Sequence, residues 1–588
     1  MFLIDAAAAL GAAGSAGGPA GAGATAVVAG SVGAGAVAAA ALGHSTVHLL
    51  VVFLVSLSIT TVLIPVLARL APALGLTDAP GPRKVHSVPV PRVGGIAMAC
   101  GILVPAFSVL EPSPALFGLL LGVLVLLAVG VWDDRVDLDY RVKFLGQILA
   151  VGLCIFVGHV RIASVSLGGL IELPPALGSG LTFLFLLGVT NAVNLSDGLD
   201  GLAGGLALLC FCGITLLAAA SGNVMVMTLA LIQAGAILAF LRFNTHPARV
   251  FMGDGGSQVL GFTIGVLAIL VTQSEASAAS AALPLLLVGI PIIDTVAVMV
   301  WRMRQGHSPF TSDRNHLHHR LLGLGFTHGE AVAILYLLQA ELFLLVYFLR
   351  FESDAVIVCV FLTFAGLLLG ALRFAGRHGW RVHAHAAATE PGSERSRRLQ
   401  RLLGRLPAVM VWPMGVGVLA YAAIAIAQSH AVGTDLGTLC LALILLLAIS
   451  SGLRGARTGS WLERLAAYVG VVLIVYLDQT TPAKPPLMSD LSWLLLGLAA
   501  AAALLRFAFL PAKRFEVTSL DMLIVFIAIV VPNLPGSLAL PAALSEGIGK
   551  ALVLLYVTEI LLTLDFKRPV PRACVMTLLA VIAARAYL

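Results

Sequence analysis

The sequence predicts an all-α membrane protein with many spanning helices. Hydrophobic residues make up 59% of its 588 residues, charged residues only 11%, and the mean hydropathy is +1.02. Soluble domains carry about 25% charged residues, so this chain lacks the polar side chains that a water-facing surface needs. Apolar windows of the ~20 residues that a bilayer span requires recur between short polar loops. This composition excludes a soluble secreted enzyme and a disordered protein, and no nucleic-acid partner is expected.

The predicted spans form two series. The first contains eleven, near 47–68, 93–110, 115–131, 145–160, 181–194, 202–220, 224–241, 257–273, 281–300, 331–349 and 355–372. The second contains seven, near 408–428, 433–451, 465–477, 491–506, 518–532, 549–564 and 573–587. We therefore divide the chain into an Ala/Gly-rich tail, an eleven-helix core, a basic cytoplasmic linker and an appended membrane module, at 1–46, 47–374, 375–405 and 406–588. Because Ala and Gly gain little from burial, we expect the tail to be flexible rather than a loose span.

The distribution of positive charge orients the spans. Lys and Arg gather in cytoplasmic loops of membrane proteins. If the first span starts outside, all but five of the 35 Lys and Arg lie in predicted cytoplasmic loops. The opposite orientation would place nearly all of them on the wrong side, so we expect the first arrangement.

Five polar segments of the first series, all on the predicted cytoplasmic side, hold a concentration of unusual residues. They lie within 78–95, 133–147, 191–201, 249–257 and 294–320, and the second series has no comparable cluster. Carboxylates near a membrane are costly and therefore mark functional sites. The carboxylates in these five segments include Asp133, Asp134, Asp197, Asp200 and Asp254.

The residue types in these segments indicate phosphate chemistry with a divalent cation. Crowded carboxylates repel one another unless some are protonated or a cation neutralises them. Oxygen donors suit Mg²⁺ or Mn²⁺ better than zinc, and the row Asn191, Asn194, Asp197, Asp200 recurs every three residues, so neighbours can share a ligand. Cationic donors suited to phosphate oxygens accompany them: Lys143, Arg302, Arg314, His316, His318 and His319. Together they predict phosphoryl transfer to a lipid-borne acceptor.

Other interpretations of the same residues remain open. An Asp-Asp pair at a helix end is commonly an interfacial charge, and the histidine-rich stretch can be a solvated loop or a transition-metal site. A chain with this many spans is also compatible with a transporter or flippase, although a transporter is expected to carry its charges near the bilayer midplane and to show an internal repeat. A non-catalytic scaffold is a third alternative.

The polar segments resemble the polyprenyl-phosphate N-acetylhexosamine-1-phosphate transferases, the family that includes phospho-MurNAc-pentapeptide transferase. The matching stretches span about residues 47–374 and read D-A-P-G-P-R-K-V-H, P-V-P-R-V-G-G, D-D-R-V-D-L-D-Y-R-V-K-F-L-G-Q, N-A-V-N-L-S-D-G-L-D-G-L, F-M-G-D-G-G-S and P-I-I-D with D-R-N-H-L-H-H-R-L. The last stretch looks like the undecaprenyl-phosphate GlcNAc-1-phosphate transferase branch, since Leu317 interrupts the three consecutive histidines of the peptidoglycan branch.

The resemblance implies a reaction and a role for each matching residue. HexNAc-1-phosphate, with GlcNAc the commonest sugar, would pass from a UDP-sugar to undecaprenyl phosphate, releasing UMP, either by direct attack or through an aspartyl intermediate. Asn194 and Asp254 would hold Mg²⁺, with Mn²⁺ as a substitute. Asp133 and Asp134 would be the catalytic acidic pair, with Asp133 the base, while Asp197 and Asp200 would shape the catalytic site and contact the nucleotide. Substrate binding would fall to Lys84, Lys143, Asn191, Asp294, Arg302, Arg314, His316, His318 and His319.

The resemblance also implies a cellular setting. The protein would lie in the bacterial inner membrane with its active site facing the cytoplasm, and it would initiate a lipid-linked envelope polysaccharide. Dimers are common in the family, so a homodimer is compatible with the resemblance. The module at 406–588 has no counterpart in the family core.

Overall fold

The structure, a computed structural model, describes eleven stretches of the chain. They are 23–79, 88–167, 169–274, 279–308, 315–382, 409–429, 432–452, 459–480, 486–509, 542–563 and 569–587. Two compact units, Met1–His48 and Leu49–Leu588, divide the chain. Helix α2 runs over Gly23–Leu74. Residues 23–46, where we expected a flexible tail, are therefore helical, and residues 1–22 of that tail lie outside the described residues.

The first series forms a helical core with two small hairpins. After α2 come α3 (Gly94–Val109), α4 (Pro114–Val136), α5 (Tyr140–Phe156), α6 (Pro175–Leu195), α7 (Leu202–Ala220), α8 (Val224–Asn244), α9 (Gly253–Thr272), α10 (Leu283–Leu287), α11 (Gly289–Arg304), α12 (Leu317–Gly323), α13 (His328–Leu349) and α14 (Asp354–Arg377). Strand β1 (Thr77–Asp78) pairs antiparallel with β2 (Val90–Pro91), and β3 (Ser164–Ser166) pairs with β4 (Leu170–Glu172).

The helices of the core differ greatly in burial. In α9 and α7, 94% and 83% of the apolar window is buried within the protein, whereas in α14 only 11% is buried. Helix α9 packs against α4 and α6, and α7 packs against α8 and α13. Thus α9 and α7 lie inside the bundle, while α14 has the largely exposed apolar surface of a helix that faces lipid.

The second series forms a bundle with its own apolar clusters. Its described helices are α17 (Val411–Gln428), α18 (Thr434–Gly452), α19 (Gly459–Thr480), α20 (Pro486–Phe509), α22 (Ala542–Thr563) and α23 (Pro569–Tyr587). Helix α19 packs against α17, α18, α22 and α23, so it lies at the centre of this bundle.

The prediction of an all-α protein with many spans is confirmed. Among the described residues, nine helices are long and apolar enough to cross a membrane, and several shorter apolar helices accompany them. One predicted span, 281–300, is divided at Val288 into the short α10 and the longer α11. The predicted span 518–532 lies outside the described residues.

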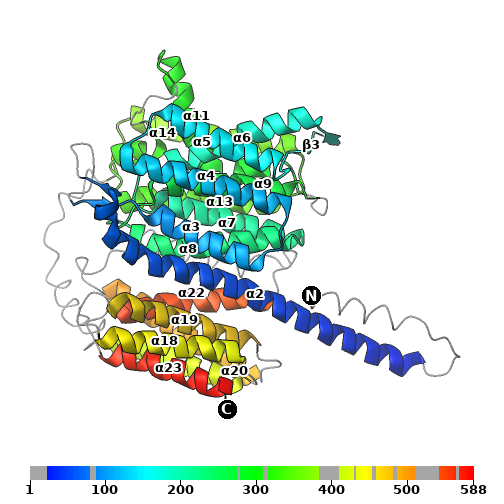
Figure 1. The fold of residues 1–588 in the computed structure, drawn as a ribbon, viewed down its shortest axis with the longest axis vertical. Coiled ribbons are helices and arrows are strands. Elements are labelled where there is room, and N and C mark those ends of the chain that lie inside the picture. The colour runs from blue at the N-terminus through cyan, green and yellow to red at the C-terminus, as the bar shows by residue number, and fades with distance from the viewer. Residues whose placement is uncertain are drawn as a thin grey trace. The chain divides into compact units, whose positions relative to one another are not determined.

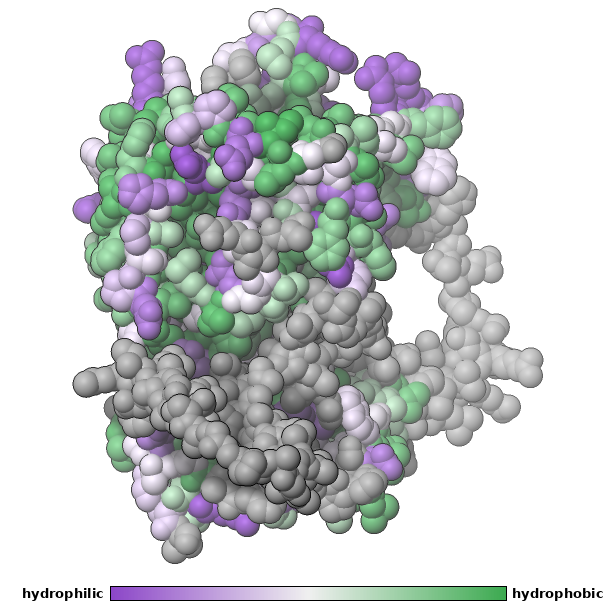
Figure 2. All heavy atoms as spheres, turned by 90° about the vertical axis from the view of Figure 1, so that its right-hand side faces the viewer, coloured by the Kyte–Doolittle hydropathy of each residue, from purple (hydrophilic) through white to green (hydrophobic). Residues whose placement is uncertain are grey.

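The two hairpins mark opposite ends of the core helices (Figure 1). The β1–β2 hairpin belongs to the end that holds the polar segments, because the Phe251 amide donates to Pro91 O at 2.8 Å. At the other end Asp354 accepts from the Ser166 amide at 2.5 Å and from the Ala282 amide at 2.9 Å, which ties the β3 end together. Figure 2 looks toward the β3 side, where hydrophilic residues are scattered among hydrophobic ones.

Candidate active site

Glycines let three helices approach closely where the polar segments meet. A Cβ atom on Gly130 of α4 would fall on the backbone of Gly255 in α9, and one on Gly95 of α3 would meet the backbone of Gly256. The Gly95 amide also donates to Met252 O at 2.9 Å. Since Asp133 lies one turn after Gly130, these contacts bring the end of α4 against the beginning of α9.

Lys143 connects the carboxylates of these two helices. Its Nζ lies 2.6 Å from Asp133 Oδ2 and 3.3 Å from Asp254 Oδ2. Asp133 is 5% exposed, and its other oxygen accepts from the Leu138 amide at 2.7 Å. Three charged residues from α4, α5 and α9 therefore converge, with a cation between two carboxylates.

Asp134 fastens the turn that precedes Asp254. Gly253 has a φ of +70°, and a Cβ there would collide with the Asp134 carboxylate, so this carboxylate packs directly on the glycine. Asp134 Oδ1 accepts from the Asp254 amide at 3.2 Å and lies 3.7 Å from Arg92, which also pairs with Asp78. The structure thus gives Asp134 a role in holding the beginning of α9.

Asn194 reaches the same place through Ser257. The Ser257 hydroxyl donates to Asn194 Oδ1 at 2.5 Å and lies 3.3 Å from Asp254 O. Asn191, one turn earlier, is engaged differently: its amide exchanges hydrogen bonds of 2.8 and 3.2 Å with Gln147. Asn194 is therefore placed to act with Asp254, whereas Asn191 belongs to a polar layer between helices.

Asp197 lies in the loop between α6 and α7, close enough to the other carboxylates for their negative charges to act on it. Burial among protein atoms raises the pKa of Asp197 to about 7, and the charges of Asp254, Asp134 and Asp200 act in the same direction. Its side chain keeps a solvent-accessible face, so the crowded surroundings open to one side. A bound cation would favour the ionised form of Asp197.

The histidine stretch packs over this loop. A Cβ on Gly198 would collide with the His318 ring, so His318 lies directly on the backbone beside Asp197. Burial lowers the pKa of His318 to about 4, and the neighbouring His319 has the same effect. At neutral pH, His318 is therefore uncharged and would meet a phosphate as a neutral hydrogen-bonding group.

Asp294 organises the same stretch from α11. Its two oxygens lie 3.0 Å from His316 Nδ1 and 2.7 Å from the Leu317 amide, which donates to it. Asp294 and His316 are both buried. The Asp294 carboxylate thus positions the start of α12, and Arg302 is buried further along α11.

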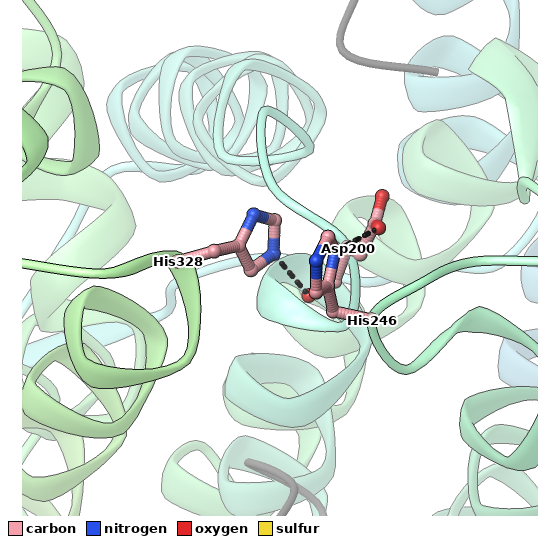
Figure 3. Close-up of side chains that lie close together, drawn as sticks. All are labelled: Asp200, His246 and His328. Carbon is pink, nitrogen blue, oxygen red and sulfur yellow. Dashed lines mark hydrogen bonds and ion pairs between the residues drawn. The ribbon is translucent and has the colours of Figure 1, made fainter. Parts of the chain in front are cut away.

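Asp200 is engaged with protein groups (Figure 3). Its Oδ2 lies 2.7 Å from His246 Nδ1 and accepts from the Ala248 amide at 3.0 Å. Its backbone carbonyl lies 3.3 Å from His328 Nε2. Neither His246 nor His328 stands out in the sequence, because each is a single histidine, His246 in the connection from α8 to α9 and His328 at the first residue of α13. Two further predicted residues, Lys84 and Arg314, lie outside the described residues.

The donors at the meeting point of α4, α6 and α9 fit a divalent cation. Asn194 and Asp254 offer the amide and carboxylate oxygens that Mg²⁺ and Mn²⁺ prefer. The ammonium of Lys143 between Asp133 and Asp254 shows that this place favours positive charge. The carboxylates that raise the pKa of Asp197 provide the excess negative charge that such a cation would neutralise.

Fold and site together define a multi-pass helical membrane protein with a carboxylate-rich centre at one end of its core helices. Residues 116–272 match the family model described as glycosyl transferase family 4. The chain is 33% identical over 300 residues to a Bacillus subtilis protein named "Probable undecaprenyl-phosphate N-acetylglucosaminyl 1-phosphate transferase", covering 50% of this chain and 84% of that protein.

Two further relatives agree. The undecaprenyl-phosphate alpha-N-acetylglucosaminyl 1-phosphate transferase of Escherichia coli K12 is 32% identical over 53% of this chain and 87% of its own length. The decaprenyl-phosphate N-acetylglucosaminephosphotransferase of Mycobacterium tuberculosis H37Rv is 36% identical over 46% of this chain and 74% of its own. The chain therefore belongs to glycosyl transferase family 4, with the polyprenyl-phosphate N-acetylglucosamine 1-phosphate transferases.

Proposed function

We propose that this protein transfers HexNAc-1-phosphate, with GlcNAc the first candidate sugar, from a UDP-sugar to undecaprenyl phosphate. UMP leaves, and the lipid-linked product initiates an envelope polysaccharide. The reaction takes place at the cytoplasmic face of the bacterial inner membrane. The observation that carries the proposal is the bridge from Lys143 to Asp133 and Asp254, because it unites residues far apart in sequence at a single charged centre.

The chemistry requires an acceptor phosphate and a diphosphate to be held together despite their negative charges. An oxygen of undecaprenyl phosphate attacks the sugar-bearing phosphorus, and the bond from that phosphorus to the bridging oxygen of UMP breaks. Asp133 accepts a remaining proton from the lipid phosphate or orients its attacking oxygen. Lys143 moves from its carboxylate partners toward the phosphates and neutralises them.

The remaining residues bind and position. Asn194 and Asp254 would hold Mg²⁺, which supplies charge neutralisation to the diphosphate when bound. Asp134 keeps the first turn of α9 in place, and Asp197 would contact the nucleotide, as the family resemblance implies. His318 contributes neutral hydrogen bonding, while Asp294 orients His316. These assignments follow the contacts described above and the family to which the chain belongs.

Purified full-length protein tests the proposal directly. UMP release is measured with UDP-GlcNAc and undecaprenyl phosphate in detergent, and a panel of UDP-HexNAc donors then ranks the sugars. We expect EDTA to stop the release and Mg²⁺ or Mn²⁺ to restore it. Turnover that is indifferent to chelation would remove the metal assignment, and no turnover with any UDP-HexNAc would remove the reaction itself.

A further inference from the structure

A second cluster of potential metal ligands lies beside the loop that holds Asp197. Among the described residues, Asp200, His246 and His328 place one potential ligand atom each within 4.8 Å of one another. They come from three segments: the loop before α7, the connection from α8 to α9, and the first residue of α13. Asp200 and His328 are half-buried and His246 is exposed, so an ion can reach them from water.

The hydrogen bonds of the two histidines determine which ring nitrogens carry a proton. The Asp200 carbonyl can only accept, so His328 Nε2 donates to it and His328 Nδ1 keeps a lone pair. His246 Nδ1 faces the Asp200 carboxylate at 2.7 Å, which leaves the lone pair of the neutral ring on His246 Nε2. The rings stack, with centroids 4.1 Å apart and planes at 21°.

This arrangement has the features of a site for a borderline metal ion. Imidazoles that bind metals usually donate their other ring N–H to a carboxylate or a backbone carbonyl, and Asp200 supplies both acceptors here. Two imidazoles and a carboxylate are a donor set that zinc favours, in contrast to the oxygen donors around Asp254.

We propose that Asp200, His246 and His328 form a second, regulatory site for a borderline divalent ion such as Zn²⁺. The same turn is held by the Asn244 side chain, which accepts from the Gly201 amide at 2.9 Å, and by the Tyr336 hydroxyl, which donates to Gly201 O at 2.6 Å. An ion bound at Asp200 changes the position of this turn and hence of Asp197. Zn²⁺ therefore inhibits transfer, a consequence that rests on the proposed function.

Isosteric variants separate metal binding from the structural hydrogen bonds. His246→Asn keeps an N–H at the position of Nδ1, and His328→Gln keeps one at the position of Nε2, yet both lose a ring nitrogen that can bind a metal. His378→Gln serves as the matched control, because His378 is an exposed histidine at the end of α14. Zn²⁺ binding to the full-length protein is measured by calorimetry in detergent with excess Mg²⁺, and Co²⁺ absorption reports the ligand set.

We expect one Zn²⁺ per chain in the wild type and in His378→Gln, and at least roughly tenfold weaker binding in His246→Asn and His328→Gln. Zn²⁺ should inhibit transfer by the wild type and lose that effect in the two variants. Unchanged Zn²⁺ binding in both variants would overturn the proposal, because the ion would then be bound elsewhere, for example by His316, His318 and His319. Zn²⁺ binding is measured without substrate. A failure of the zinc-site proposal is therefore distinguishable from a failure of the proposed transferase reaction.

Discussion

The core and the appended bundle differ in how far their paired charged side chains are exposed. In the core, charged side chains from α4, α5 and α9 meet near the ends of helices. The side chains of Lys143 and Asp254 are 25% and 36% exposed there, although that of Asp133 is only 4% exposed. In the appended bundle, Lys550 and Asp478 form an ion pair at 2.8 Å with 1% and 0% of their side chains exposed. Lys550 also lies 5.1 Å from the centre of the Trp493 ring.

The difference teaches where chemistry is accessible. Partly exposed charges of mixed sign can exchange protein partners for a substrate, as the Lys143 bridge must do in the proposed reaction. A completely buried pair would have to pay the cost of an unpaired charge in a low-dielectric bundle before binding anything else. The pair between α19 and α22 therefore fixes how these helices pack. The Bacillus relative is much shorter than this chain, because the 300 matched residues already form 84% of it.

The largest effect is expected in the core. Asp133→Asn keeps the shape of the side chain but removes the proton acceptor, so kcat for UMP release should fall by roughly 10²–10⁴-fold. Asp435→Asn, at an exposed carboxylate in α18 of the appended bundle, should leave kcat unchanged. Equal turnover in Asp133→Asn and the wild type, with the protein still folded, would refute the role of Asp133.

In the appended bundle the corresponding change should affect stability and leave chemistry intact. Lys550→Met leaves Asp478 buried without its cation, which should lower the free energy of unfolding by about 3–5 kcal/mol. The double variant Asp478→Leu/Lys550→Met should recover most of this loss. Denaturation in detergent measures the stability, and UMP release per folded molecule should remain at the wild-type level. Lost turnover in a stable Lys550→Met protein would instead make the bundle part of the catalyst.

A smaller effect is expected from a glycine that positions the core site. Gly130→Ala places a methyl group against the backbone of Gly255, and overpacking of this kind costs about 1–3 kcal/mol. Because Asp133 follows one turn later, kcat should fall as well. Gly152→Ala in α5 is the control, since its Cβ would have no neighbour within 4 Å. Unfolding midpoints and kcat are measured for both variants. Equal values in Gly130→Ala and Gly152→Ala would contradict the packing argument.

The sequence was sufficient for the fold class, and it singled out the segments that meet at the candidate site. Length and composition require spanning helices, because so few charged residues cannot make a soluble surface. The carboxylates of α4 and α9 stood out because charge is rare in this chain. Single-chain hydropathy also found the second series, although it predicted neither the break at Val288 nor the helix that extends back to Gly23.

What the sequence by itself determined is which residues are polar in an apolar chain, and hence which segments we expect at membrane edges. Only the tertiary structure decided their partners: that Lys143 bridges Asp133 and Asp254, that Asp200 meets His246 and His328, and that Asp478 meets Lys550. Hydropathy depends on each residue alone, whereas these contacts depend on how closely glycine-lined helices approach and on the rotation of each helix about its axis.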